Sequence, residues 1–342
     1  MSYSDQNEGR IIRMPSLSME QRMLEINSII ENRAFDDDRL VYSFVLHLYS
    51  NQEIDECIGF VTAKLNAVKD EYRLYYHLWY ISLLYLRGFF DDAKTIFYSL
   101  PINDIPNNIK TFYLITLGFD ALYRDFFVME TAHFVFHIHP NRYRNQNNIH
   151  HKVTRRELGY EIVAKNFFGL SLERKIHYFL WDDESMKPYF SNSQTCSCYG
   201  VIQEGEYDRD WHESTHVYNY LYGIENPKSF ILEGLAVLYD GKTSIVRLRY
   251  ARAAYQGLRI TPHIKEWWLD PVAFRQTNSW IAYTTAGYFL FKLRSLYGKE
   301  KLLQLAKYQT FEDACRIYGE AEISKLISEV EEEISNLGTG NP

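Results

Sequence analysis

The stretch Trp211–Val217, which reads Trp-His-Glu-Ser-Thr-His-Val, decides how the rest of the chain is interpreted. His212 and His216 stand four residues apart. On an α-helix of about 3.6 residues per turn, both imidazoles leave the same face and can share one metal ion. Glu213 lies between them, rotated around the helix, where it can accept a proton from a metal-bound water. The pattern predicts a helical zinc site with a general base, but so short a pattern also arises by chance and needs support elsewhere.

The composition is that of a globular protein. Of the 342 residues, 46% are hydrophobic and 16% aromatic, which excludes wholesale disorder and is enough for two ordinary domains. The net charge is −7 without any dense run of lysine and arginine, so nucleic acid is not an expected partner. Charges interrupt every apolar stretch before bilayer length, and Met1–Arg13 is polar. We therefore expect a cytoplasmic protein with no signal peptide, membrane segment or membrane partner.

The four cysteines do not indicate a structural framework. Cys57, Cys196, Cys198 and Cys315 are too few and too scattered for a set of disulfides. Cys196 and Cys198 have one residue between them, whereas zinc knuckles have at least two. No cysteine-based metal site is expected.

We expect residues 1–17 to be a polar leader. The sequence of residues 18–123 predicts a helical domain. Apolar residues recur there at three- and four-residue spacing in six segments: 20–31, 39–49, 53–65, 71–87, 90–100 and 108–123. Short turns separate these segments. This half of the chain contains no group of residues with catalytic spacing.

Part of this helical region resembles a tetratricopeptide-like repeat. Residues 88–93, Gly-Phe-Phe-Asp-Asp-Ala, followed by Phe97, are typical of the second half of such a repeat. A shift of 36 residues superimposes Cys57 on Ala93 and Val61 on Phe97. We expect an array of helical hairpins, with an irregular helical domain as the alternative.

The pattern changes to period two at His133–His139, which predicts a strand. His133, His137 and His139 would then share one face of this strand. With no acidic partner nearby in the sequence, we expect a solvent-facing surface rather than a second metal site.

Further elements follow before the motif. Arg156–Phe168 predicts an amphipathic helix closed by Gly169, and Lys175–Trp181 predicts a strand. Tyr199–Glu204 predicts another strand, placed directly before the motif helix. In thermolysin-like architectures a strand in this place forms the sheet edge on which a substrate peptide pairs, so we expect it at an edge.

The motif helix and its successor have start and stop signals. Asp208 or Asp210 is expected to cap the motif helix, which Gly223 ends. A second helix is expected over Phe230–Asp240, ended by Gly241.

Glu233 is the expected third ligand, because a catalytic zinc usually has three protein ligands and an open fourth position. It lies 17 residues beyond His216, enough chain to finish one helix and return antiparallel beside it. Gly234 and Ala236 are small, as two tightly packed helices at a metal require.

Together these residues resemble the gluzincin metallopeptidases, more narrowly the peptidase-MA-like families related to the aminopeptidase and thermolysin-like catalytic domain. The resemblance is carried by His-Glu-Ser-Thr-His, by the downstream Glu-Gly-Leu-Ala and by Tyr283–Gly287, which reads Tyr-Thr-Thr-Ala-Gly. It extends over roughly Asp125–Leu337 and leaves the N-terminal helices outside.

The resemblance implies one Zn²⁺ held by His212, His216 and Glu233, with Glu213 as the general base for peptide hydrolysis. In relatives, a tyrosine at the position of Tyr283 points at the scissile carbonyl. The resemblance therefore implies that Tyr283 donates a hydrogen bond to the developing oxyanion.

The chain departs from the aminopeptidases upstream of the motif. There, a Gly-Ala-Met-Glu-Asn-type segment supplies the acid that holds the free amine of the substrate. Here Cys198–Glu206 reads Cys-Tyr-Gly-Val-Ile-Gln-Glu-Gly-Glu, in which Glu204 or Glu206 is a candidate replacement. We therefore favour an endopeptidase over an aminopeptidase.

Two supporting roles stay open. An acid that would orient a ligating imidazole is not identifiable, because Val237 stands one turn after Glu233; Asp240 is a candidate farther around the helix. His263 is an alternative to Tyr283 for the oxyanion contact.

The sequence thus predicts an α+β, mainly helical protein. A helical-hairpin domain, 18–123, precedes a thermolysin-like gluzincin domain, 125–342, with a small sheet and a C-terminal helical lobe. The expected function is a zinc metallopeptidase acting on peptide or protein substrates, with the N-terminal helices as a hypothetical recruitment domain. One alternative is a helical-repeat binding module whose zinc domain is vestigial or structural. Another is a zinc hydrolase of a non-peptide amide or ester.

Overall fold

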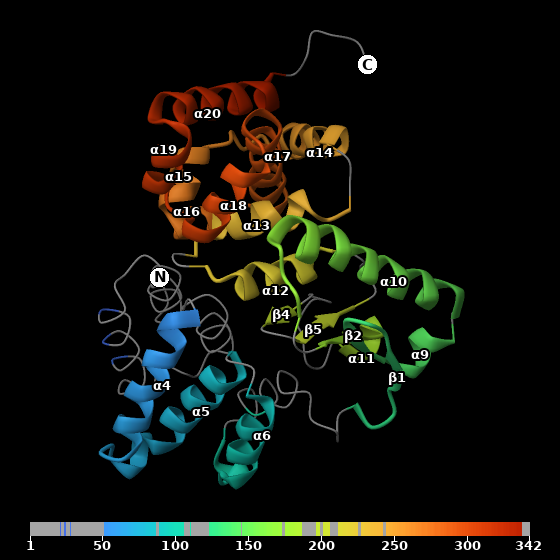
Figure 1. The fold of residues 1–342 in the computed structure, drawn as a ribbon, viewed down its shortest axis with the longest axis vertical. Helices are drawn as coiled ribbons and strands as arrows, with labels where there is room; N and C mark the ends of the chain where they lie inside the picture. Colours follow the sequence, from blue (N-terminus) through green and yellow to red (C-terminus); the bar gives the residue numbers. More distant parts are fainter. Residues whose placement is uncertain are drawn as a thin grey trace. The chain divides into compact units, whose positions relative to one another are not determined.

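The protein is described by a computed structural model over residues 51–86, 89–105, 123–144, 146–172, 175–186, 196–198, 201–205, 211–224, 227–241 and 244–336, with Gln21, Leu24, Ser28 and Lys110. Its contacts form two compact units (Figure 1): Met1–Glu157 with Leu172–Asp208, and Leu158–Ser171 with Arg209–Pro342. The predicted leader and helix 39–49 lie outside the described residues, as do most of the predicted helices 20–31 and 108–123.

The N-terminal helices of the first unit follow the predicted periodicity. They are α4 (Asn51–Leu65), α5 (Asp70–Leu86) and α6 (Phe90–Ser99), followed by the short 3-10 helix η2 (Ile102–Asp104). Helix α5 packs against both α4 and α6. Cys57 and Val61 of α4, and Ala93 and Phe97 of α6, are completely buried. The positions that the 36-residue shift superimposes are therefore all core positions.

The first unit also holds a five-stranded sheet. Its strands are β1 (Phe127–Glu130), β2 (Phe134–Ile138), β3 (Ile176–Leu180), β4 (Cys196–Cys198) and β5 (Val201–Glu204), in the order β1-β2-β3-β5-β4. Strands β2, β3 and β5 run parallel, and β1 and β4 pair antiparallel at the two edges. The predicted strands are confirmed. The expected edge position of β5 is wrong, because β4 pairs along it, with Ser197 opposite Ile202.

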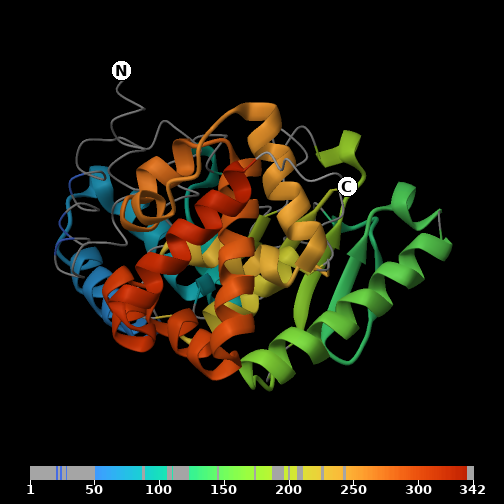
Figure 2. The same ribbon diagram turned by 90° about the horizontal axis from the view of Figure 1, so that it is seen from above.

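One face of this sheet is buried, and helix α10 (Gln146–Gly159) covers it. Phe134, Phe136 and Ile138 alternate with partly exposed neighbours along β2. Tyr178 in β3 stands opposite both Phe136 and Ile202, so all three side chains share the buried face. Figure 2 shows α10 running alongside the strands. The short helices α9 (Pro140–Tyr143) and α11 (Asp183–Met186) follow β2 and β3.

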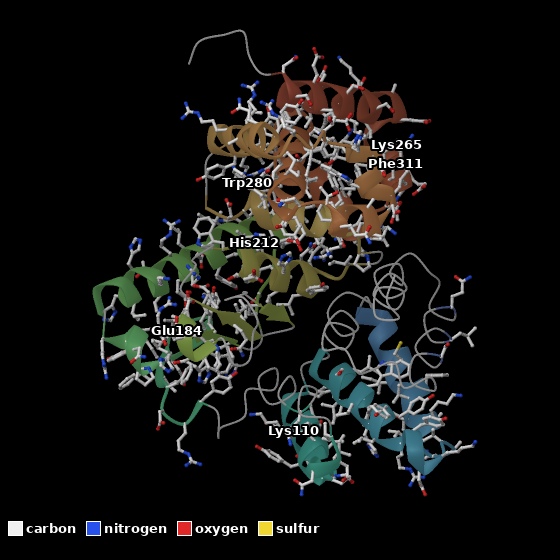
Figure 3. All side chains as sticks on the ribbon, turned by 180° about the vertical axis from the view of Figure 1, so that it is seen from behind. Lys110, Glu184, His212, Lys265, Trp280 and Phe311 are labelled. Carbon is white, nitrogen blue, oxygen red and sulfur yellow. The ribbon has the colours of Figure 1, made fainter. Side chains whose placement is uncertain are left out.

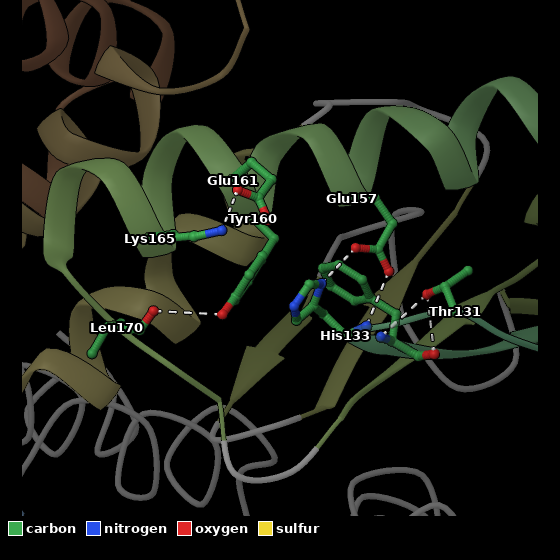
Figure 4. A network of polar contacts seen from close by, with 8 residues as sticks. Thr131, His133, Glu157, Tyr160, Glu161, Lys165 and Leu170 are labelled. Atoms are coloured by element: carbon green, nitrogen blue, oxygen red, sulfur yellow. Dashed lines mark hydrogen bonds and ion pairs between the residues drawn. The ribbon is translucent and has the colours of Figure 1, made fainter.

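The three histidines are each partly buried and have different neighbours, so they do not form one solvent-facing surface, and His133 has an acidic partner. His133 donates through its backbone to Glu157 Oε1 at 3.0 Å, and its Nδ1 lies 2.6 Å from Glu157 Oε2 (Figure 4). His137 is half-buried, with Nε2 2.9 Å from His177 Nδ1. His139 caps α9 by accepting from Asn141 N at 3.3 Å.

Every regular element of the second unit, among its described residues, is a helix. It comprises the π-helical segment η3 (Tyr160–Phe168), α12 (His212–Tyr222), α13 (Ser229–Leu238), α14 (Ser244–Leu258), α15 (Ile264–Leu269), α16 (Pro271–Gln276), α17 (Ser279–Tyr297), α18 (Lys299–Tyr308), α19 (Phe311–Tyr318) and α20 (Glu320–Ser335). Helix α17 packs against α13, α14, α18 and α20, so α17 forms the centre of this unit. Within the described ranges, no helix has the length and apolar character that crossing a membrane requires.

Several predicted boundaries hold in this unit. The helix ending at Phe168 is closed by Gly169 at φ 71°, although it begins at Gln146 as α10 and becomes π-helical at Tyr160. The motif helix α12 is closed by Gly223 at φ 90°. Both glycines have left-handed backbone conformations that cost other residues more. The mainly helical α+β class is thus confirmed.

Candidate metal centre

Helices α12 and α13 bring three predicted residues together. Glu233 Oε2 lies 3.4 Å from His212 Nε2 and 3.5 Å from His216 Nε2. The ligand-capable atoms of the three side chains all lie within 4.8 Å of one another, and all three side chains are buried. The two imidazole rings are inclined at 85° with centroids 5.0 Å apart. Figure 3 labels His212 on α12.

The donor set fits a zinc ion. Two imidazole nitrogens and one carboxylate oxygen are typical zinc ligands, with bonds of about 2.0–2.2 Å. In a tetrahedral site with such bonds, two ligand atoms are about 3.3 Å apart. The carboxylate–imidazole distances of 3.4 and 3.5 Å are close to this value. The Glu233 oxygen is therefore placed to share one ion with either imidazole, and the two imidazole nitrogens lie within 4.8 Å of each other.

The electrostatics of this group also suit a cation. Burial alone would raise the pKa of Glu233, but His216, His212 and Arg275 hold it well below its ordinary value. Burial alone would lower the pKa of His216, but the charges of Glu233 and Glu213 raise it. The negative charge of Glu233 thus lies beside the two imidazoles. A cation bound between these three side chains would be stabilised by that charge.

Glu213 lies in the first turn of α12 and is buried. Its charge contributes to the raised pKa of His216, so it is close to the three-residue group without belonging to it. This leaves its carboxylate for another role than ligation.

The motif helix has Trp211 at its N-cap position. The Trp211 side chain makes no capping hydrogen bond; Asp208 and Asp210 lie outside the described residues. Instead, the Trp211 ring lies against Gly159, where an added Cβ would stand 2.6 Å from Trp211 Cδ1. Packing on a small residue therefore places the turn that carries His212.

Tyr283 also reaches the centre, through an arginine that the sequence pattern does not single out. Arg275 Nη1 lies 3.4 Å from Glu233 Oε1 and donates a hydrogen bond to the Tyr283 hydroxyl oxygen at 3.1 Å. The Tyr283 ring stacks on Phe274, with ring planes 9° apart. The only sequence signal here is the Asp270-Pro271 start of α16, in which Asp270 accepts from Val272 N. That signal predicts a helix but no role for Arg275.

Gly234, the small residue after Glu233, acts differently from the prediction. A Cβ at Gly234 would stand 2.8 Å from Leu290 Cδ1 and 3.1 Å from the Ala286 carbonyl oxygen, both on α17. The close approach of α13 at Gly234 is therefore to α17 and not to the motif helix. This approach holds the helix of Tyr283 beside the helix of Glu233.

Two acids considered from the sequence have other partners. Glu204 is buried and accepts from Arg156 Nη2 at 2.9 and 3.1 Å, and from the Tyr178 hydroxyl. Asp240 lies 3.7 Å from Arg247 Nη2, whose guanidinium also binds carbonyl oxygens at the end of α13. Glu204 is thus engaged in the sheet layer, and Asp240 at the end of its helix.

His263 is exposed at the N-terminus of α15, and the backbone of its neighbour Ile264 donates to Glu331 of α20. Tyr283, rather than His263, has the described connection to Glu233. Comparison with protein-family models, characterised proteins and solved structures finds no match for this chain. The function must therefore be inferred from the geometry of the centre.

Proposed function

We propose that this protein is a zinc-dependent metallopeptidase. The observation that carries the proposal is the convergence of His212, His216 and Glu233, with Glu213 in the same helical turn as His212. The three side chains would hold one Zn²⁺, which when bound polarises a carbonyl and lowers the pKa of a water. A purely structural zinc usually has four protein ligands and needs no base, so the three ligands that the described part of the chain supplies favour catalysis.

The remaining residues supply the proton transfer and the charge stabilisation. Glu213 takes the proton of the attacking water on its carboxylate and passes it to the leaving amine nitrogen. The Tyr283 hydroxyl donates a hydrogen bond to the substrate carbonyl oxygen as negative charge develops there. Burial of the three ligands and of Glu213 strengthens these interactions, because less water competes for the charged groups.

The position of Glu204 supports an endopeptidase over an aminopeptidase. An acid that holds the free amine of a substrate needs an accessible carboxylate, whereas Glu204 is 1% exposed and paired with Arg156. Glu206, the other candidate, lies outside the described residues. A substrate with a blocked N-terminus should therefore be cleaved as well as a free one.

The N-terminal helices favour a second function for their part of the chain. The matched burial of Cys57, Val61, Ala93 and Phe97 supports stacked hairpins, which form extended protein-binding surfaces. We propose that they recruit a protein substrate. The same observation also fits the rival function, a binding module with a vestigial or structural zinc domain. Glu213 argues against this rival, because a structural zinc needs no general base.

The test combines zinc content with hydrolysis of a mixed peptide library by the parent and by Glu213→Gln. We expect about one zinc per chain in both proteins, and cleavage reduced by about 10²–10⁴-fold in the variant, because it lacks the general base. Glu161→Gln is a matched control, since Glu161 is an exposed acid paired with Lys165.

Absence of bound zinc in the parent would disprove the metal centre. Bound zinc with equal inactivity of parent and Glu213→Gln would favour the binding module. Cleavage of esters or non-peptide amides without peptide cleavage, identified by analysis of the products, would change the substrate class.

A further inference from the structure

The guanidinium of Arg275 connects three helices at the centre. It lies 3.4 Å from Glu233 Oε1 on α13, donates to the Tyr283 oxygen on α17 at 3.1 Å, and donates from Nε to Ser229 Oγ at the start of α13 at 3.2 Å. Arg275 itself belongs to α16. One planar group therefore contacts both the proposed ligand and the proposed oxyanion donor.

The two carboxylate oxygens of Glu233 have different neighbours. Oε2 faces both imidazoles, and Oε1 faces Arg275. A carboxylate free to rotate can offer a metal either one oxygen or two. Because Arg275 holds Oε1 on the far side, only Oε2 is directed at the space between His212 and His216.

Tyr283 is oriented by the same contact. Arg275 Nη1 donates, so the phenol oxygen accepts there and the phenol O–H must point away from the guanidinium. Stacking on Phe274, the residue before Arg275, fixes the plane of the ring. The guanidinium fork is rigid, so it also limits how far Tyr283 and Glu233 can move apart.

Charge alone does not explain an arginine in this place. Its positive charge, 3.4 Å from Glu233 Oε1, favours the ionised carboxylate. The same charge repels a bound cation, which weakens metal binding. A net benefit to the centre must then come from geometry.

We propose that Arg275 is a positioning residue that fixes Glu233 as a one-oxygen metal ligand and aims the Tyr283 hydroxyl at the same centre. This inference rests on the proposed metal centre and deepens it. Groups that orient metal ligands typically change metal affinity or activity by about 10–100-fold when they are removed.

The experiment compares the parent with Arg275→Gln and Arg275→Lys, each stripped of metal and reloaded with zinc or with Co²⁺ as a coloured substitute. Arg275→Gln keeps donors but loses the fork, and Arg275→Lys keeps the charge but loses the planar geometry. In both, we expect zinc affinity measured by chelator competition to fall about 10–100-fold. We also expect the visible Co²⁺ spectrum to change as Glu233 adopts two-oxygen binding.

Arg252→Gln is the matched control. Arg252 is a half-buried arginine of α14 that donates from Nε to the Glu333 carbonyl oxygen at 2.8 Å. Its loss should leave both the zinc affinity and the Co²⁺ spectrum unchanged. Circular dichroism of every variant identifies any that fails to fold, and in that case the conservative Arg275→Lys carries the comparison.

Tyr283→Phe separates the two parts of the proposal. It should lower kcat with little change in KM, zinc affinity or Co²⁺ spectrum. If Arg275 acts on the reaction partly by aiming Tyr283, the two substitutions will not be independent. The fold-loss in kcat of the double variant will then be smaller than the product of the fold-losses of Arg275→Gln and Tyr283→Phe.

Zinc affinity and Co²⁺ spectrum equal to the parent in folded Arg275→Gln would overturn the proposal, even if cleavage fell. A parent that binds zinc and cleaves no peptide would instead overturn the proposed function, while the metal measurements still decide the role of Arg275. A parent that binds no zinc would overturn both.

Discussion

Gly287 of α17 lies directly against Val237 of α13, so closely that a Cβ at Gly287 would stand 2.3 Å from Val237 Cγ1. Glu233 stands one turn before Val237, and Tyr283 one turn before Gly287. The contact therefore sets the distance between the two helices that carry a proposed ligand and the proposed oxyanion donor.

Gly287→Ala should force α13 and α17 apart. We expect a loss of about 1–3 kcal/mol in the free energy of unfolding, as for other overpacked cores, together with weaker zinc binding. Urea unfolding and chelator competition measure the two effects. Gly257→Ala in α14 is the control, because its Cβ would meet only Trp280 Cζ3 at 3.8 Å. Unchanged stability in Gly287→Ala would show that the helices can separate without cost.

Gly159→Ala should disturb the first turn of the motif helix, since the new methyl group would stand 2.6 Å from Trp211. The backbone of Gly159 is already right-handed helical at φ −61°, so the effect would be steric and not a change of backbone preference. We expect altered tryptophan fluorescence and weaker zinc binding. Gly59→Ala in α4, where nothing lies within 4 Å of the added Cβ, should change neither. Parent-like zinc affinity in Gly159→Ala would mean that Trp211 does not place His212.

Arg156→Met should destabilise the sheet layer strongly. It leaves the Glu204 carboxylate, 1% exposed, without its guanidinium partner and with Lys152 Nζ, 3.9 Å from Oε1, as the cation beside it. A broken buried pair costs about 3–5 kcal/mol, so we expect a loss toward the lower end of this range. Glu204→Gln added to Arg156→Met removes the stranded charge but keeps an acceptor for Tyr178, so urea unfolding should show partial recovery. Arg316→Met, at an exposed pair with Asp313, should cost little. A double variant no more stable than Arg156→Met would exclude the stranded charge as the cause.

The free energy of unfolding should depend on Glu157 in a way that changes with pH, at pH values below the ordinary pKa of a glutamate. Burial opposes its ionisation, but hydrogen bonds from His133 and Thr131 hold its pKa below the ordinary value of a glutamate. A carboxyl whose folded pKa is lowered stabilises the fold above its unfolded pKa, and this contribution is lost as the pH falls through the folded value. The stability difference between parent and Glu157→Gln should therefore be full at pH 6 and shrink below about pH 4. A difference that grows on acidification would contradict the assignment.

The local features of the fold are predictable from the sequence. Period-two alternation at 134–138 and the glycines at 169 and 223 depend on neighbouring residues, and the structure places a strand and two helix ends there. His212 and His216 are one helical turn apart, so their common direction is also a local property.

Features that depend on docking of distant segments are not predictable in this way. Strand β4 covers only 196–198, too short to show a period, yet it moves β5 from the sheet edge to the interior. Arg275 lies 42 residues beyond Glu233, and its contact exists only because α16 packs beside α13. The same holds for Gly234, whose partner helix the sequence does not specify.

The contacts of one guanidinium with Glu233 and with Tyr283 have a thermodynamic corollary. A cation held against Glu233 and a carbonyl compound bound to the Tyr283 hydroxyl bias the same side chain, so their binding free energies are coupled. Linkage requires this coupling to be reciprocal. A compound that binds more tightly to the metal-loaded protein must therefore raise the affinity of the protein for the metal by the same factor. At equilibrium, bound substrate would then raise the chelator concentration needed to remove the metal.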